Sequence, residues 1–230
     1  MRTILSTLAV LSMLQTAPNL AEADPVVVEL YTSQGCSSCP PADAMLHDLA
    51  QRDDVIALAL HVDYWDYIGW KDVFGRAENT ARQHAYARAA SATTVYTPQM
   101  IVGGVDHVIG SRPMQIMDLI QSHRQRSYPV TVSLTRSDDM IQIAATSTEA
   151  NSYVVELIRY LPEATVDIRR GENAGRTISY TNIVRSLDRV AEWDGNGVLK
   201  ITAQAPGDDA VAVLVQQVDY GPIAGAAQLR

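Results

Sequence analysis

The order of apolar and polar residues predicts alternating strands and helices over the first half of the chain. Residues 26–31 and 55–62 are short apolar runs of the kind that forms buried strands. Between them, apolar residues at helical spacing predict a helix over residues 36–52, with Pro40 and Pro41 in its first turn. A strand–helix–strand unit of this kind implies that the two strands pair in parallel.

The same pattern then predicts a loop, a helix, a hairpin and a last helix. Residues 63–74 are an aromatic-rich loop, and residues 76–92 have the character of a helix. Two apolar runs separated by Gly103-Gly104 predict a β-hairpin. Residues 112–127 complete this half as a helix.

Beyond residue 128 the pattern changes to short apolar or alternating segments that are separated by turn residues. The spacing of these segments predicts an all-β, sandwich-like domain over residues 129–230. The expected strands cover residues 130–134, 140–144, 152–160, 164–168, 177–184, 197–203 and 210–218.

The N-terminal residues resemble a secretory signal peptide. Arg2 precedes an apolar run over residues 3–14, and Ala21 and Ala23 supply the small residues of a cleavage site. We expect residues 1–23 to be removed and the mature protein to be periplasmic or secreted, without membrane attachment; the alternative is a retained N-terminal anchor. The net charge of -8 argues against nucleic acid as a partner.

The chain has 2 cysteines, and both lie in one Cys-X-X-Cys sequence, Cys36-Ser37-Ser38-Cys39. A bridge that closes so small a loop constrains the unfolded chain little, so stabilisation is a poor reason for it. At a helix N-terminus the thiol of Cys36 would favour its anionic form. We therefore expect a partly exposed Cys36 to attack a substrate disulfide and the more buried Cys39 to resolve the mixed disulfide.

The order strand, Cys-X-X-Cys, strand, helix, Thr97-Pro98, hairpin, helix resembles the thioredoxin fold. The resemblance implies that Pro98 follows a cis peptide bond and faces the dithiol. It also suggests Glu29 as the proton acceptor for the buried cysteine, although Glu29 lies one residue further from Cys36 than the pattern of thioredoxins. The alternative is that Glu29 is an edge-strand carboxylate that faces solvent.

A closer resemblance covers nearly the whole mature chain. The segments ELYTSQGCSSCPPAD, HVDYWDYIGWKD, YTPQMIVGG and RGENAGRTISYTNIVR are similar to a family of secreted bacterial proteins catalogued as domain of unknown function 1223. This resemblance implies export and a thioredoxin-like domain joined to a β-rich domain. The expected fold is thus an α/β thioredoxin-like domain over residues 24–128 followed by the all-β domain.

These observations favour an exported thiol–disulfide oxidoreductase that acts on protein thiols or disulfides without a cofactor or metal. The aromatic loop would supply part of the substrate surface beside Thr97, through Tyr64, Trp65 and Trp70. The alternative is that these rings form a local core. Whether the protein reduces, oxidises or isomerises disulfides, and its oligomeric state, stay open.

Two other functions stay open. The dithiol could hold copper or zinc with a histidine, or form an inert disulfide in an interaction protein. Further candidates are a calcium site in the aromatic loop and an anion site at residues 171–175, the latter set against an ordinary hairpin loop. The candidate histidines for the metal site are His61, His84 and His107. The candidate calcium ligands of the aromatic loop are Asp63, Asp66 and Asp72.

Overall fold

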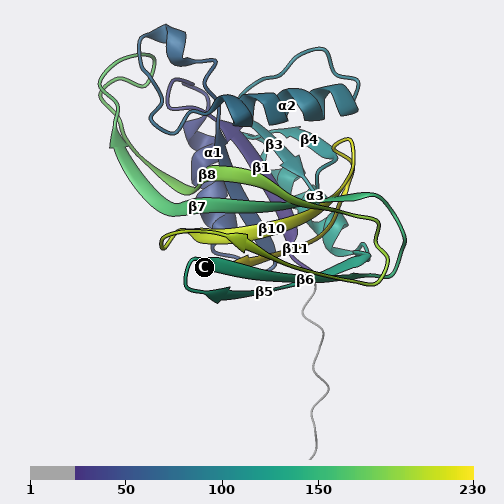
Figure 1. The fold of residues 1–230 in the computed structure, drawn as a ribbon. Helices are drawn as coiled ribbons and strands as arrows, with labels where there is room; N and C mark the ends of the chain where they lie inside the picture. Colours follow the sequence, from purple (N-terminus) through teal and green to yellow (C-terminus); the bar gives the residue numbers. More distant parts are fainter. Residues whose placement is uncertain (1–23) are drawn as a thin grey trace, which may run out of the picture.

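The computed structural model describes residues 24–230, which form two β-sheets and three α-helices (Figure 1). The larger sheet has eight strands in the order β11-β10-β7-β8-β2-β1-β3-β4, and the smaller has the order β5-β6-β9. The helices are α1 (Pro40–Ala50), α2 (Ala77–Ala89) and α3 (Pro113–Arg124), with a short 3-10 helix η1 (Asp66–Ile68). The strands are β1 (Val26–Thr32), β2 (Val55–His61), β3 (Gln99–Val102), β4 (Asp106–Ile109), β5 (Val130–Ser137), β6 (Met140–Ser147), β7 (Tyr153–Asp167), β8 (Thr177–Trp193), β9 (Val198–Gln204), β10 (Ala210–Gln217) and β11 (Ile223–Leu229).

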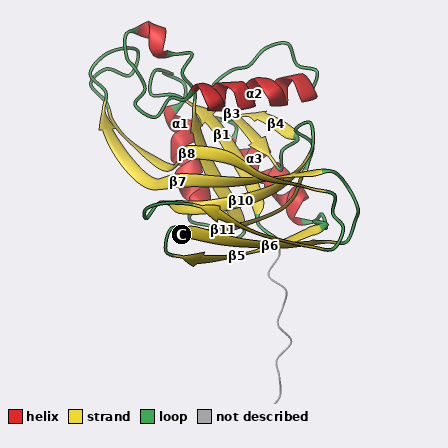
Figure 2. Ribbon diagram, viewed as in Figure 1, coloured by secondary structure: helices red, strands yellow, loops and turns green. Residues whose placement is uncertain are grey.

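The first half has the element order that the apolar pattern predicts. Strands β1 and β2 pair in parallel, β3 pairs antiparallel with β1, and β4 closes the hairpin with β3. Alternate residues of β1 face opposite sides of the sheet. Val28 and Leu30 pack with α1 and α3, whereas Val27 and Tyr31 lie in the core that Tyr86 of α2 joins. Figure 2 shows these strands together with the helices α1, α2 and α3.

The expected fold class, a thioredoxin-like domain followed by a separate β-sandwich, is wrong. Strand β8 of the second half pairs in parallel with β2, with Ala59 opposite Ile183, so the sheet runs on without a break into β7, β10 and β11. The amide of Asn182 also donates to the carbonyl oxygen of Ala57 at 2.8 Å. The boundary expected near residues 128–129 falls in the connection between α3 and β5.

The hydrophobic core likewise extends across both halves of the chain. One cluster unites Ile56 and Leu58 of β2 with Ile158 of β7 and Leu214 of β10. The smaller sheet packs on the other side of β7 and β10 through a second cluster that includes Ile143. A layered, sandwich-like region therefore exists, but its larger layer is the sheet that also carries β1 and β2.

Two features of the second half differ from the strands expected there. The segments expected at 152–160 and 164–168 form the single strand β7. Strand β8 continues beyond the expected segment to Trp193, and it can include polar residues such as Arg185 because one of its faces is exposed to solvent. Strand β11 was not expected, since its small residues give little periodic signal.

None of the helices formed by residues 24–230 has the length and apolar character that crossing a membrane requires. The expected signal peptide, residues 1–23, lies outside the described residues.

Candidate functional site

Cys36 and Cys39 form a disulfide in the turn that links β1 to α1. The backbone N–H of Cys39 donates to the carbonyl oxygen of Cys36 at 3.2 Å, and α1 begins only at Pro40, with Cys39 as its N-cap. The expectation that Cys36 opens the helix is therefore wrong by one turn. Pro40 and Pro41 begin the helix instead, where proline loses no hydrogen bond.

Both cysteines are buried, which corrects the expectation of a partly exposed Cys36. Cys36 is 1% exposed and Cys39 is 0% exposed. A loop from the second half of the chain, residues 168–176 between β7 and β8, lies against the turn that carries the cysteines, and we call it the cover loop. In Figure 1 this end of the β7–β8 hairpin lies beside the segment that carries η1.

Two side chains of the cover loop bind the backbone of the disulfide turn. The buried amide of Asn173 donates to the carbonyl oxygens of Gln34 at 3.0 Å and Cys36 at 2.9 Å. The carboxylate of Glu172 accepts a hydrogen bond from the N–H of Ser37 at 3.3 Å. Residues 171–175, expected as a hairpin loop or an anion site, thus form a hairpin loop that closes over the disulfide.

The aromatic loop supplies the neighbouring walls. The indole N–H of Trp65 donates to Oγ1 of Thr97 at 2.7 Å, and that of Trp70 donates to Oε1 of Gln34 at 2.8 Å. A Cβ atom at Gly35 would lie 3.2 Å from Cβ of Trp65, so the turn and Trp65 are in close contact. Both tryptophans therefore lie against the turn, whereas the hydroxyl of Tyr64 donates to Gln83 on α2.

Pro98 lies close to the start of α1. The Thr97–Pro98 peptide bond is cis, as the resemblance implied. A Cβ atom at Gly110 would lie 3.0 Å from Cβ of both Pro98 and Ala42. Gly110 is therefore packed between the proline and the first turn of α1, with no room for a side chain.

Glu29 does not have the environment expected of a proton acceptor for the dithiol. Strand alternation places it on the face of β1 toward α2, opposite the face that packs on α1. Its two carboxylate oxygens accept hydrogen bonds from Arg82 Nε at 2.7 Å and the Tyr86 hydroxyl at 2.6 Å. Its side chain is 0% exposed, so it is not a solvent-facing carboxylate either.

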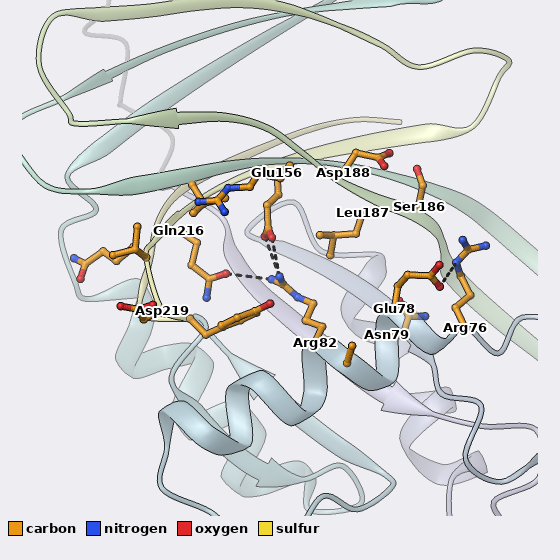
Figure 3. Close-up of a pocket in the computed structure, with 16 residues that line it drawn as sticks. Arg76, Glu78, Asn79, Arg82, Glu156, Ser186, Leu187, Asp188, Gln216 and Asp219 are labelled. Atoms are coloured by element: carbon orange, nitrogen blue, oxygen red, sulfur yellow. Dashed lines mark hydrogen bonds and ion pairs between the residues drawn. The ribbon is translucent and has the colours of Figure 1, made fainter.

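Arg82 is the centre of this buried network (Figure 3). Besides Glu29, its guanidinium donates to both carboxylate oxygens of Glu156 at 3.0 Å, to Tyr86 at 3.0 Å and to Gln216 at 3.2 Å. All five N–H groups of an arginine are thereby used. Arg82, Glu156 and Gln216 line a pocket of about 670 Å³, and their hydrogen bonds join α2 and β1 to β7 and β10.

A second buried polar cluster lies on the α1 side of the sheet, beside the disulfide turn. Asp43, in the first turn of α1, accepts a hydrogen bond from the Thr32 hydroxyl at 2.7 Å. His61, at the end of β2, is paired through Nδ1 with Asp72 at 2.7 Å, and the ring of Tyr180 lies edge-on to His61 with centroids 4.8 Å apart.

The pKa values of Asp43 and Asp72 are shifted in opposite directions. Burial raises the pKa of Asp43 to about 7, against the lowering effect of the His61 charge and the Thr32 hydrogen bond. For Asp72, burial also acts to raise the pKa, but the charge of His61 and hydrogen bonds from His61, Gln34 and Phe74 outweigh it and hold the pKa below its usual range. Sequence reasoning missed Asp43, although its position four residues after Cys39 places both on one helix face.

The remaining metal candidates do not come together. His84 is exposed on α2, and Nδ1 of His107 lies 3.4 Å from the amide of Gln99. In the aromatic loop, Asp63 accepts from Thr80 and Asp66 from the N–H of Asp72. Within residues 24–230, no three side chains of histidine, cysteine, aspartate or glutamate are grouped in a way that could hold a metal ion.

Comparison with known proteins gives a family and a structural relative. The family described as "Protein of unknown function (DUF1223)" matches residues 27–216. A crystal structure of a protein from Agrobacterium tumefaciens is 36% identical, with a TM-score of 0.79, over 90% of this chain and 95% of that one. A hypothetical protein from Pyrococcus horikoshii is 10% identical over 46% of this chain and 95% of its own, and its TM-score of 0.22 supports no argument. No curated protein matches the sequence.

Proposed function

The chain belongs to the DUF1223 family, described only as proteins of unknown function, and we propose that it carries out thiol–disulfide exchange through Cys36 and Cys39. The observation that carries this proposal is the disulfide itself, which closes a loop with a sequence separation of 3. Chain entropy gives so short a loop about 2 kcal/mol, less than half of the roughly 4.7 kcal/mol of a 100-residue loop. A bridge of low structural value beside an acid of raised pKa supports a chemical role.

The exchange proceeds in two balanced steps. A substrate thiolate attacks Sγ of Cys36, a mixed disulfide forms, and the electron pair of the broken bond leaves on Sγ of Cys39. A second substrate thiolate then displaces Cys36, so that the substrate gains a disulfide and this protein becomes a dithiol. The reverse sequence reduces a substrate disulfide, and the physiological direction depends on the partner.

Substrate access requires the cover loop to move. Cys36 is 1% exposed, and the hydrogen bonds of Asn173 and Glu172 hold the cover loop on the disulfide turn. Lifting residues 171–175 from the turn breaks these three hydrogen bonds, whereas Ile168 at the start of the cover loop is buried and packs in a cluster with Trp70. Local opening of this size is small compared with global unfolding.

We place the substrate surface between the aromatic loop and the cis-proline hairpin. Trp65 contacts both Gly35 and Thr97, which supports its role as a wall beside an extended substrate segment. Trp70 contacts both Gln34 and Gly171 of the cover loop, so it would be uncovered when that loop opens. The elements from β1 to α3 follow one another in the predicted order, and the sheet continues beyond them into β8, β7, β10 and β11.

The proposed location is the periplasm or the exterior of the cell. The signal-like N-terminal sequence supports export, and a disulfide persists in oxidising compartments. The partner would then be an exported protein with a thiol or disulfide.

The second candidate is an inert disulfide in an interaction protein, which the burial of both sulfurs favours. Alkylation after mild reduction distinguishes the two. If exchange is the function, dithiothreitol opens the bridge of the native protein and Cys36 is then alkylated while the fold is intact. If the bridge is inert, both cysteines react only at denaturant concentrations that unfold the chain.

A further inference from the structure

The cluster beside the disulfide turn contains buried polar atoms that the fold does not use. Oδ2 of Asp43, Nε2 of His61 and the hydroxyl of Tyr180 have no hydrogen-bond partner among the described residues. The exposed fractions of these residues are 5%, 0% and 1%. Leaving a buried polar group unpaired costs about 1–3 kcal/mol, so three such groups in one place point to a task other than stability.

Asp43 is placed to act on Cys39. Its backbone N–H donates to the carbonyl oxygen of Cys39 at 3.1 Å, and the four-residue spacing puts both side chains on one face of the helix start. The Thr32 hydroxyl holds Oδ1 and leaves Oδ2 free to accept a proton. On the far side of the cluster, the hydrogen bond from His61 to Asp72 fixes the imidazole through Nδ1 and leaves Nε2 free.

We propose that Asp43 accepts and returns the proton of the Cys39 thiol during exchange, and that the charge of His61, whose ring Asp72 holds, stabilises the Asp43 carboxylate. This inference rests on the proposed function. Asp43 is the acid–base group, and the Thr32 hydroxyl, which donates to its Oδ1, orients it. The arrangement follows the general logic of a nucleophile, a base and a third group that orients the base.

The step balances in protons and electrons. In the mixed disulfide, Cys39 is a thiol and Asp43 a carboxylate. As Sγ of Cys39 attacks Sγ of Cys36, its proton passes to Asp43, the Cys36–Cys39 bond forms, and the bond from Cys36 to the substrate sulfur breaks. The electron pair of that bond leaves on the substrate sulfur as a thiolate, and the substrate is reduced while the dithiol is oxidised.

The elements packed against α1 bring the groups that set the charge of Asp43. These are His61 from β2, Asp72 from the aromatic loop and Tyr180 from β8, while β1 contributes the neutral Thr32. Because burial raises the pKa of Asp43 to about 7, the carboxyl can both take and give a proton near neutral pH. The rate of the resolving step should therefore rise with pH through the neutral range.

The first test measures the titration of Asp43 by carbon-13 NMR in the oxidised protein and in the protein reduced with dithiothreitol. Coupling to Cys39 predicts that the midpoint differs between the two states by at least about half a pH unit, a threefold change in proton affinity, because linkage is reciprocal. The same midpoint in both states would overturn the proposal. This measurement needs neither substrate nor a variant.

The second test measures the pH profile of mixed-disulfide resolution in Asp43→Asn, with exposed Asp48→Asn on the same helix as the control. We expect the rate at pH 7 to fall about tenfold or more, at the low end of general acid–base effects, and the inflection near neutral pH to disappear. Exchange with an unchanged profile would overturn the role of Asp43 and leave the proposed function standing. Absence of exchange in the wild type, with redox-dependent titration of Asp43, would overturn only the proposed function.

Discussion

Replacing Asp43 with asparagine should change how the stability of the protein depends on pH. Asparagine has nearly the same shape and can still accept the hydrogen bond from the Thr32 hydroxyl through Oδ1. The substitution removes the ionisable group and places two N–H donors at the position of Oδ2. The pH-dependent part of its effect on stability therefore reports the free energy of burying the charged carboxylate.

The magnitude follows from the pKa of the carboxyl in the two states. The value rises from 3.8 in the unfolded chain to about 7 in the folded protein, mainly because of burial. At 1.36 kcal/mol per unit, the ionised carboxylate destabilises the fold by about 4 kcal/mol above neutral pH. Between the two values the native state binds more protons than the unfolded state, so the stability of the wild type falls as the pH rises from about 4 to 7.

Asp72 contributes with the opposite sign but in another range. Its pKa is lowered in the folded state, so its contribution is complete at higher pH and is lost as the pH falls toward and below its ordinary value of 3.8. A comparison between about pH 5 and 8.5 therefore reports mainly on Asp43.

The assay is chemical denaturation of the oxidised protein across this pH range. Asp43→Asn should gain stability relative to the wild type as the pH rises, by up to about 4 kcal/mol at pH 8.5. The control Asp48→Asn should follow the wild-type curve, because Asp48 is exposed. A constant difference between Asp43→Asn and the wild type from pH 5 to 8.5 would show that the carboxyl is not held in the surroundings described above.

Three further outcomes follow from the structure. Asn173→Ala should speed reduction of the disulfide by dithiothreitol about 5- to 100-fold, because two hydrogen bonds that close the cover loop are lost. Arg170→Ala in the same loop is the control, and equal rates for Asn173→Ala and the wild type would show that the cover loop does not protect the disulfide. Arg82→Met should lower the free energy of unfolding by about 3–5 kcal/mol, measured by denaturation, since it leaves two buried carboxylates without their cation. Trp65→Ala should slow exchange with a protein substrate more than with a small disulfide, and equal losses would identify the indole as local core.

The sequence predicted the elements of the first half because each has a strong local signal. Apolar runs marked β1 and β2, and the glycine pair and the proline marked the hairpin. The continuation of the sheet could not be read in this way. It depends on the pairing of Ile183 with Ala59, residues 124 positions apart, and nothing local to either strand specifies that partner.

Those parts of the candidate site that depend on local sequence were predicted, and those that depend on long-range contacts were not. The disulfide and its neighbouring tryptophans follow from local spacing, and strand alternation could have excluded Glu29 from the dithiol side of the sheet. The i to i+4 relation between Cys39 and Asp43 was also available. The contact of Asn173 with Cys36 joins positions 137 residues apart, so only the folded chain reveals that the disulfide is covered.

The central claim is that Cys36 exchanges disulfides with a protein partner, and trapping with Cys39→Ser tests it most directly. Without the resolving thiol, the mixed disulfide between Cys36 and the partner should accumulate. The account predicts a covalent complex that mass spectrometry locates at Cys36, that dithiothreitol releases, and that forms faster when Asn173→Ala is added. A folded Cys39→Ser protein that forms no such complex, with Cys36 alkylated only after denaturation, would contradict the claim.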